Sequence, residues 1–259
     1  MVTRKSRAEI ERMRTAGRVL AEAFARIEAA LRPGVTTAEL DRIAEQCILD
    51  AGMTPSFKDY LGNGRYQAGH RHAYPATSCI SLDDEVVHGI PGDRVIGDGT
   101  VVSVDLGAIH QGWHADAART WIVGSASDEK RALVDTTARA LRAGIAAAVP
   151  GNHVRDISAA IEDVAAPGHY GIVRTFVGHG IGSEMHQDPQ VPNYRSRDKG
   201  LKLAPGLCLA IEPMLTLGTD DVDVTSDAWT VVTRDGSLAA HFEDTIAITD
   251  HGPEVLTSL

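Results

Sequence analysis

The chain has 259 residues, of which 43% are hydrophobic and 23% charged, and its formal net charge is −10. This excess of acids argues against a nucleic-acid-binding protein, which needs a basic face to displace counterions. Cys47, Cys79 and Cys208 are widely spaced and form no CxxC pair, which argues against a zinc ribbon or a disulfide framework and indicates a reducing, cytoplasmic compartment. Apolar runs are too short for a membrane span, and the N-terminus is not a secretory signal.

Four stretches have the features of amphipathic helices. Ser6 followed by Glu9 forms a capping-box pattern, and apolar residues then recur at helical spacing. Thr36 or Thr37 starts the second helix. The predicted helices cover residues 7–31, about 37–50, 127–149 and 154–166, and all but the second end next to a Pro-Gly pair.

The remaining apolar segments are short and typical of strands. They alternate with turn residues, and residues 61–75, which are dense in glycine and histidine, are predicted to form a loop. The predicted strands cover residues 77–82, 85–90, 100–109, 118–124, 173–182, 207–215 and 228–249.

A weak internal repeat accompanies this pattern. Residues 33–45 and 150–162 align without gaps, each starting with Pro-Gly and leading into a helix. Either two amphipathic helices simply look alike after a Pro-Gly turn, or the chain consists of two helix-helix-strand halves, roughly 6–124 and 125–259. The second interpretation predicts one α+β domain over residues 1–259, with a functional site between its pseudo-symmetric halves.

An acid interrupts the strand predicted over residues 100–109. Alternation places Asp105 on the same face as Val101 and Ser103. A turn centred near residues 110 and 111 would bring Asp105 opposite Asp116. Two ionised carboxylates so close repel each other, so one is protonated, both face water, or a cation lies between them.

Three more polar residues lie in or beside apolar runs: His179, Glu212 and Glu243. An unpaired charge in a buried strand is very costly, so a shared metal site accounts for all five residues together. Four carboxylates and one imidazole suit Mn²⁺, Fe²⁺, Co²⁺ or Zn²⁺. Four negative charges match two such ions, an arrangement typical of hydrolytic enzymes.

Five motifs now resemble the methionine aminopeptidases, in the right order along nearly the whole chain. They are VVHGIP (residues 86–91), VDLGAIHQGWHADAART (104–120), GHGIGSEMHQDPQVPNY (178–194), AIEPM (210–214) and HFEDTIAIT (241–249). The resemblance implies a pita-bread fold, with two halves of antiparallel sheet and outer helices around a dinuclear metal site. The short interval between His179 and Glu212 resembles that of the bacterial type 1 enzymes.

The resemblance also implies roles for individual residues. Asp116 and Glu243 would bridge two divalent ions, Asp105 would complete one, and His179 with Glu212 the other. In the family, the bridging hydroxide attacks the scissile carbonyl. Glu212 would handle its proton, and the non-ligand histidines His88 and His186 would contact the substrate amide, with His186 stabilising the oxyanion. The methionine pocket would be lined by Tyr74, Cys79, Met185 and Trp229, although buried residues of these types also occur in plain cores.

The activity implied is removal of initiator methionine from nascent chains when the second residue is small. It implies a cytoplasmic monomer that meets its substrates at the ribosome exit and binds neither nucleic acid nor membrane. The alternatives are an Xaa-Pro aminopeptidase of the same fold, a non-catalytic pita-bread module, which would have lost ligands, and a phosphoryl-transfer enzyme, for which no phosphate cradle is evident.

One segment departs from the family pattern. Residues 58–73 are about ten residues longer than the corresponding family segment, and the aromatic residue expected just before Tyr74 is absent, because Arg71 and His72 occupy that region. His110 and His114, near the predicted hairpin turn, match no ligand position and are assigned no role.

Overall fold

The computed structural model describes residues 2–61 and 72–259, so most of the long segment 58–73 lies outside the described residues. None of the helices in the described part is long and apolar enough to cross a bilayer. The helical elements are α1 (Arg7–Ala30), α2 (Thr37–Asp50), α3 (Asp128–Ala147), α4 (Val154–Ala165) and the 3₁₀ turn η1 (Ala166–Gly168).

The helix starts predicted from capping patterns are confirmed. The Ser6 side chain accepts a hydrogen bond from the backbone of Glu9, whose carboxylate accepts one from the backbone of Ser6. Thr36 and Glu39 form the same reciprocal pair at the start of α2. Each pair satisfies two backbone N–H groups that a helix start otherwise leaves without partners.

The predicted strands are present, but several are shorter than expected. The strand predicted over residues 85–90 ends at Val87. The next residue, His88, has a left-handed backbone with φ of +61°. Residues 173–177 lie outside any strand, because an apolar pattern does not reveal whether a partner strand is available. Residues 228–249, predicted as strand and turn, form three strands. The strands are β1 (Thr54–Pro55), β2 (Ser78–Leu82), β3 (Glu85–Val87), β4 (Val101–His110), β5 (Trp113–Ile122), β6 (Gly171–Ile172), β7 (Gly178–Gly180), β8 (Gln187–Val191), β9 (Cys208–Ile211), β10 (Met214–Thr216), β11 (Val222–Val224), β12 (Val231–Thr233), β13 (Ala239–His241), β14 (Glu243–Thr249) and β15 (Gly252–Val255).

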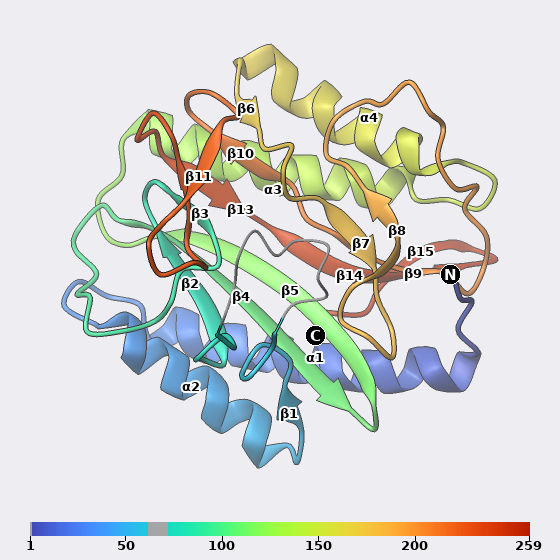
Figure 1. Ribbon diagram of the computed structural model, residues 1–259, viewed down its shortest axis with the longest axis horizontal. Helices are drawn as coiled ribbons and strands as arrows, with labels where there is room; N and C mark the ends of the chain where they lie inside the picture. Colours follow the sequence, from blue (N-terminus) through green and yellow to red (C-terminus); the bar gives the residue numbers. More distant parts are fainter. Residues whose placement is uncertain (1, 62–71) are drawn as a thin grey trace.

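A nine-stranded sheet runs through both halves of the chain. Its main path is β1-β4-β5-β14-β9-β7-β8, with β2 on β4 and β15 on β14. The halves join where β5 pairs antiparallel with β14, in register Ala118 to Glu243. Helices α1 and α2 lie on one side of the strands and α3 and α4 on the opposite side (Figure 1). This confirms the α+β class and the helix-helix-strand order of each half.

The internal repeat is visible in the backbone. Gly34 and Gly151, the second residues of the two Pro-Gly pairs, both have φ of +95°. Each donates its N–H to a later segment, Gly34 to the carbonyl of Ile96 and Gly151 to that of Leu203. The residues that precede α2 and α4 each form an isolated antiparallel bridge, Thr36 to Val95 and His153 to Lys202. The two segments therefore share more than an amphipathic pattern.

The register of the β4–β5 hairpin differs from the prediction. The turn consists of Gln111 and Gly112, both with positive φ, so Asp116 pairs with Gly107 rather than with Asp105. A two-residue turn with both residues left-handed matches the twist of the strands better than a turn one residue earlier. The two aspartates are consequently diagonal neighbours on one face of the hairpin.

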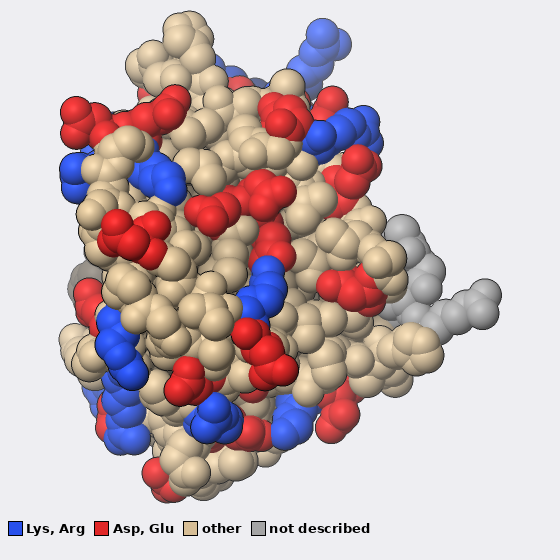
Figure 2. Space-filling view, turned by 90° about the vertical axis from the view of Figure 1, so that its left-hand side faces the viewer, with Lys and Arg blue, Asp and Glu red and all other residues tan. Residues whose placement is uncertain are grey.

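Charge is distributed without segregation on the face seen in Figure 2. Acidic and basic side chains are interspersed there, and no extended basic patch gathers on it. This face therefore gives no sign of the basic footprint that nucleic acid requires.

We expect the halves to unfold together, because the β5–β14 pairing makes the sheet continuous between them. Trp121 reports on the first half and Trp229 on the second. Two variants, each carrying Trp113→Phe and retaining only one of these two tryptophans, should give the same urea midpoint in metal-free buffer by fluorescence and by circular dichroism. Two separated midpoints would contradict a single domain over residues 1–259.

Candidate metal centre

Strands β4 and β5 present two carboxylates to the interior. Asp116 is 3% exposed, and the hydroxyl of Thr245 on β14 fixes its backbone by accepting from its N–H at 2.9 Å and donating to its carbonyl at 2.8 Å. Asp105 lies opposite Ala118 on the same face of the hairpin. Strand alternation thus explains why an acid in an apolar run points into the molecule.

His179 comes from β7, which pairs with β9 and with the edge strand β8, and it lies between two glycines. A Cβ at Gly178 would lie 2.5 Å from the Ala210 carbonyl oxygen, and one at Gly180 would lie 2.2 Å from that of Asp188, so only glycine allows the neighbouring strands to approach. Nδ1 of His179 donates to the carbonyl of Gly180 at 3.0 Å. This bond leaves the lone pair of Nε2 directed to the interior, as metal-binding histidines require.

The two glutamates flank the same space. Glu243 begins β14 and is 2% exposed, while Glu212 directly follows β9 and keeps 13% of its side chain exposed. The Asn193 side chain donates to the backbone carbonyl of Glu212 at 3.0 Å and holds it at this strand end.

The five side chains predicted as ligands converge. One potential ligand atom from each of Asp116, His179 and Glu243 lies within 4.8 Å of the others. Nε2 of His179 is 3.9 Å from Asp116 and 3.5 Å from Glu212. Asp105 lies close enough to Asp116 for their carboxyl groups to interact directly.

Burial makes this cluster unfavourable as a set of bare anions. It raises the pKa of Asp105 to about 7 and that of Glu212 to about 8. The pKa values of Asp116 and Glu243 rise well above their usual range, first because of burial and then because neighbouring carboxylates repel the charge. Burial also lowers the pKa of His179 to about 4, so the imidazole supplies no positive charge near neutrality.

The described residues supply no lysine or arginine as an ion-pair partner of these carboxylates. Their recorded ion-pair partners are His179 and His241 alone. One oxygen on each of Asp105, Asp116 and Glu243 is buried without a hydrogen-bond partner. Such groups normally have a partner, and oxygen-rich donors with one imidazole fit a divalent cation.

Comparison with known proteins agrees with this interpretation. Residues 11–250 match metallopeptidase family M24. The chain belongs to this family. Curated relatives include a methionine aminopeptidase from Clostridium acetobutylicum, 48% identical over 99% of both chains. Methionine aminopeptidase 1 from Mycobacterium tuberculosis is 47% identical over 99% of this chain and 95% of its own.

Solved structures of M24 relatives have the same pita-bread architecture. The methionine aminopeptidase of Thermotoga maritima superposes with a TM-score of 0.93 at 38% identity, with all of both chains covered. An Xaa-Pro dipeptidase from Bacillus anthracis reaches a TM-score of 0.76 at 25% identity, and the match covers 99% of this chain but 62% of the dipeptidase. The Xaa-Pro enzyme is therefore the more distant relative.

The histidines predicted to contact substrate lie beside this cluster of carboxylates and His179. The His186 ring lies against that of His179, with centroids 4.4 Å apart and the two rings tilted by 54°. His88 packs edge-on against Trp229 at 6.4 Å and against Phe176 at 5.4 Å. Burial, and then the adjacent imidazoles of His179 and His88, lower the pKa of His186 well below its usual value.

The four predicted pocket residues, Tyr74, Cys79, Met185 and Trp229, fall into one buried apolar cluster. Cys79 pairs with Asp105 across β2 and β4, so this cluster adjoins the carboxylates. Tyr74 meets Trp229 edge-on at 5.1 Å. The arrangement agrees with a side-chain pocket, but a role in substrate binding stays a prediction.

Two residues near the cluster were not singled out from the sequence. Nε2 of His241 is buried without a hydrogen-bond partner, 4.0 Å from Glu212 and 3.9 Å from Glu243. Its position two residues before Glu243, the spacing that places side chains on one face of an extended chain, could have indicated it. The Tyr60 hydroxyl lies 2.6 Å from Nδ1 of His186, a contact between residues 126 positions apart that no local pattern predicts.

The two hairpin histidines are not members of the group Asp116, His179 and Glu243 that could hold a metal among the described residues. His114 interacts through its ring Nδ1 with the Ser56 hydroxyl at 3.0 Å. The backbone N–H of His114 donates to the carbonyl of Gly182 at 2.8 Å. The first contact ties β5 to the residue after β1, and the second ties it to the segment that follows β7.

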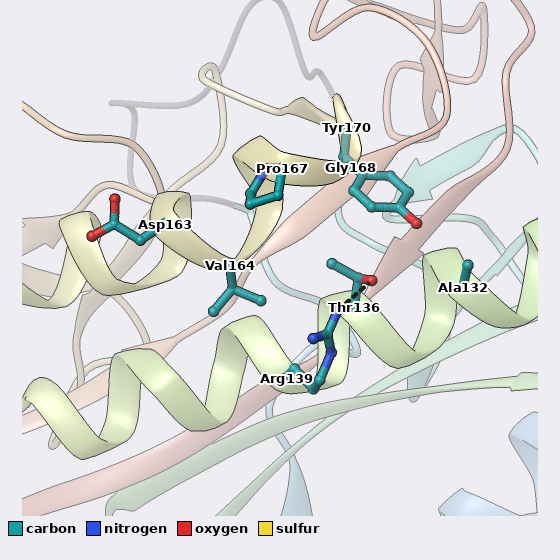
Figure 3. A pocket seen from close by; sticks show the side chains of 8 residues that line it. All are labelled: Ala132, Thr136, Arg139, Asp163, Val164, Pro167, Gly168 and Tyr170. Carbon is teal, nitrogen blue, oxygen red and sulfur yellow. Dashed lines mark hydrogen bonds between the residues drawn. The ribbon is translucent and has the colours of Figure 1, made fainter.

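A hollow of about 520 Å³ elsewhere on the surface has no connection with this chemistry (Figure 3). It opens between α3, α4 and η1, and Arg139 on its floor donates to Thr136 at 3.0 Å. The residues lining it include none of those predicted to bind metal or substrate.

The raised pKa values predict how pH affects stability without metal. Asp105 and Glu212 bind protons more tightly in the folded chain than at their ordinary pKa values of 3.8 and 4.5. Their protonation favours the folded state at low pH, and this advantage is lost as pH rises toward 7–8. The melting temperature in chelator should therefore fall between pH 5.5 and 8.

Added divalent metal should reverse this loss, because it binds the ionised carboxylates and excess ligand stabilises the folded state. A double variant, Asp105→Asn with Glu212→Gln, serves as the control. In the absence of metal, its melting temperature should depend less on pH than that of the wild type. Metal-free stability that increases from pH 5.5 to 8 in the wild type, with the double variant unchanged, would contradict the assignment.

Proposed function

We propose that the protein is a metal-dependent aminopeptidase that removes the N-terminal methionine of polypeptides whose second residue is small. The observation that supports it most is the buried, uncompensated carboxylate cluster around His179, in a chain with methionine aminopeptidase relatives over its full length. The large apolar cluster beside the carboxylates is suited to an unbranched apolar side chain.

We propose two divalent ions, of cobalt, manganese, iron or zinc. Asp116 and Glu243 would contact both, Asp105 one, and His179 with Glu212 the other. A divalent ion in this position polarises the scissile carbonyl and makes a bound water more acidic. Four carboxylates balance the charge of two such ions, whereas a single ion would leave net negative charge in a buried space.

The chain's own residues handle the substrate and its protons. Glu212, the more exposed of the two glutamates, would accept a proton from the attacking water and deliver it to the leaving nitrogen. His186 would donate from Nε2 to the developing oxyanion, and His88 would hold the substrate amide. The methionine side chain would lie among Tyr74, Cys79, Met185 and Trp229.

The substrates we propose are nascent polypeptides. The chain would meet them in the cytoplasm near the ribosome exit, acting as a monomer, with the substrate's N-terminus as its only required partner.

Loss of a shared ligand should abolish activity. We expect Asp116→Ala and Glu243→Ala each to lower methionine release from Met-Ala-Ser at least about a thousandfold, because several kcal/mol of transition-state stabilisation depend on the ions. Activity should be assayed metal-free and with Mn²⁺, Co²⁺, Fe²⁺ and Zn²⁺ added separately.

Asp223→Ala is a matched control, since this exposed aspartate pairs only with Arg234 and should retain full activity. Retained activity in the Asp116 or Glu243 variants would refute the ligand assignment. Cleavage of Gly-Pro without cleavage of Met-Ala-Ser would instead favour the Xaa-Pro relatives.

A further inference from the structure

Tyr60 lies beside the proposed substrate site although it belongs to the long segment that departs from the family pattern. Two backbone hydrogen bonds of 2.9 Å tie it in place: Asp59 donates to the carbonyl of Tyr74, and Tyr74 donates to the carbonyl of Tyr60. The two ends of the segment therefore meet at Tyr60 and Tyr74. Tyr60 supplies an aromatic ring next to Tyr74 in space, where the sequence lacks one just before Tyr74.

The Tyr60 side chain reaches the histidine proposed to stabilise the oxyanion. Its hydroxyl oxygen is 2.6 Å from Nδ1 of His186, and the two ring centroids are 5.5 Å apart with an interplanar angle of 39°. The centroids of the His186 and His179 rings are 4.4 Å apart, with an interplanar angle of 54°. Tyr60, His186 and His179 thus form a continuous row of rings that ends at the proposed metal ligands.

The proton count on the imidazole gives this contact a chemical consequence. A neutral imidazole has one N–H, which resides on Nδ1 or on Nε2. If Nδ1 carried the proton, it would donate to the Tyr60 oxygen, and Nε2 would have nothing to donate to a substrate carbonyl. If the phenol donates to Nδ1, the proton must reside on Nε2.

We propose that Tyr60 is a positioning residue that donates to Nδ1 of His186 and so keeps the proton on Nε2, directed to the scissile carbonyl. The inference rests on the proposed function, because it assumes that His186 stabilises the oxyanion. Tyr60 itself need not touch the reacting atoms. Tyr60, in the described part of the long segment, then contributes to the reaction geometry.

The test is Tyr60→Phe in the metal-loaded enzyme, with Tyr170→Phe, which removes a hydroxyl far from the cluster, as the matched control. We expect kcat for Met-Ala-Ser to fall about tenfold to a hundredfold, the usual effect of removing an outer-shell partner, with KM changed less than about threefold. Bound metal and melting temperature should not change. Unchanged kcat, or a rise in KM alone, would overturn the proposal.

A second measurement reads the tautomer directly, and the result that decides it is obtained on the wild-type protein. Long-range ¹H–¹⁵N correlation on zinc-loaded protein, with His186→Asn to assign the signal, should show the His186 proton on Nε2 in the wild type. The signal should shift toward the other tautomer in Tyr60→Phe. A proton on Nδ1 in the wild type would overturn the proposal.

The double variant separates this inference from the proposed function. If His186 acts as proposed, His186→Asn alone should lower kcat, and adding Tyr60→Phe should cost less than about a further twofold. Full activity in His186→Asn would refute the role of His186 itself. A large loss in His186→Asn with no loss in Tyr60→Phe would refute only the role of Tyr60.

Discussion

Four buried carboxylates with no lysine or arginine partner among the described residues are the constraint on which the rest of the structure depends. Asp105, Asp116 and Glu243 lie on three strands and Glu212 follows a fourth, and within residues 2–61 and 72–259 their ion-pair partners are the histidines His179 and His241. Like charges at such short range in a low-dielectric interior are strongly unfavourable. A fold that keeps them together must either protonate them or bind cations, and a metallopeptidase family is one that binds cations.

The sheet explains how distant segments reach one place. Antiparallel pairing of β5 with β14 joins the halves, and β9 and β7 extend the same sheet, so each strand can present one acid or imidazole to a common space. Thr245 links the backbone of Asp116 on β5 to β14. The repeated Pro-Gly turns at Gly34 and Gly151 place equivalent helices on the two sides. The cluster therefore lies between two halves, neither of which holds all five of its residues.

The sequence predicted those features that depend on local chemistry. Capping boxes located the helix starts, and an acid in an apolar strand indicated a buried site before any contact was known. The predicted hairpin register was wrong, because the turn lies at Gln111 and Gly112, one residue later than predicted. Moving the turn by one residue shifts the pairing by two residues and leaves the same side chains on each face, so the apolar pattern does not distinguish the two registers. The contact between Tyr60 and His186 joins residues far apart in the chain and could not be predicted from either neighbourhood.

Anomalous diffraction from crystals of the manganese-loaded protein, recorded at the manganese edge, tests the central claim most directly. The account predicts two peaks per chain, both within bonding distance of Asp116 and Glu243, with Asp105 at one and His179 and Glu212 at the other. A single peak, or manganese bound away from these five residues, would contradict it.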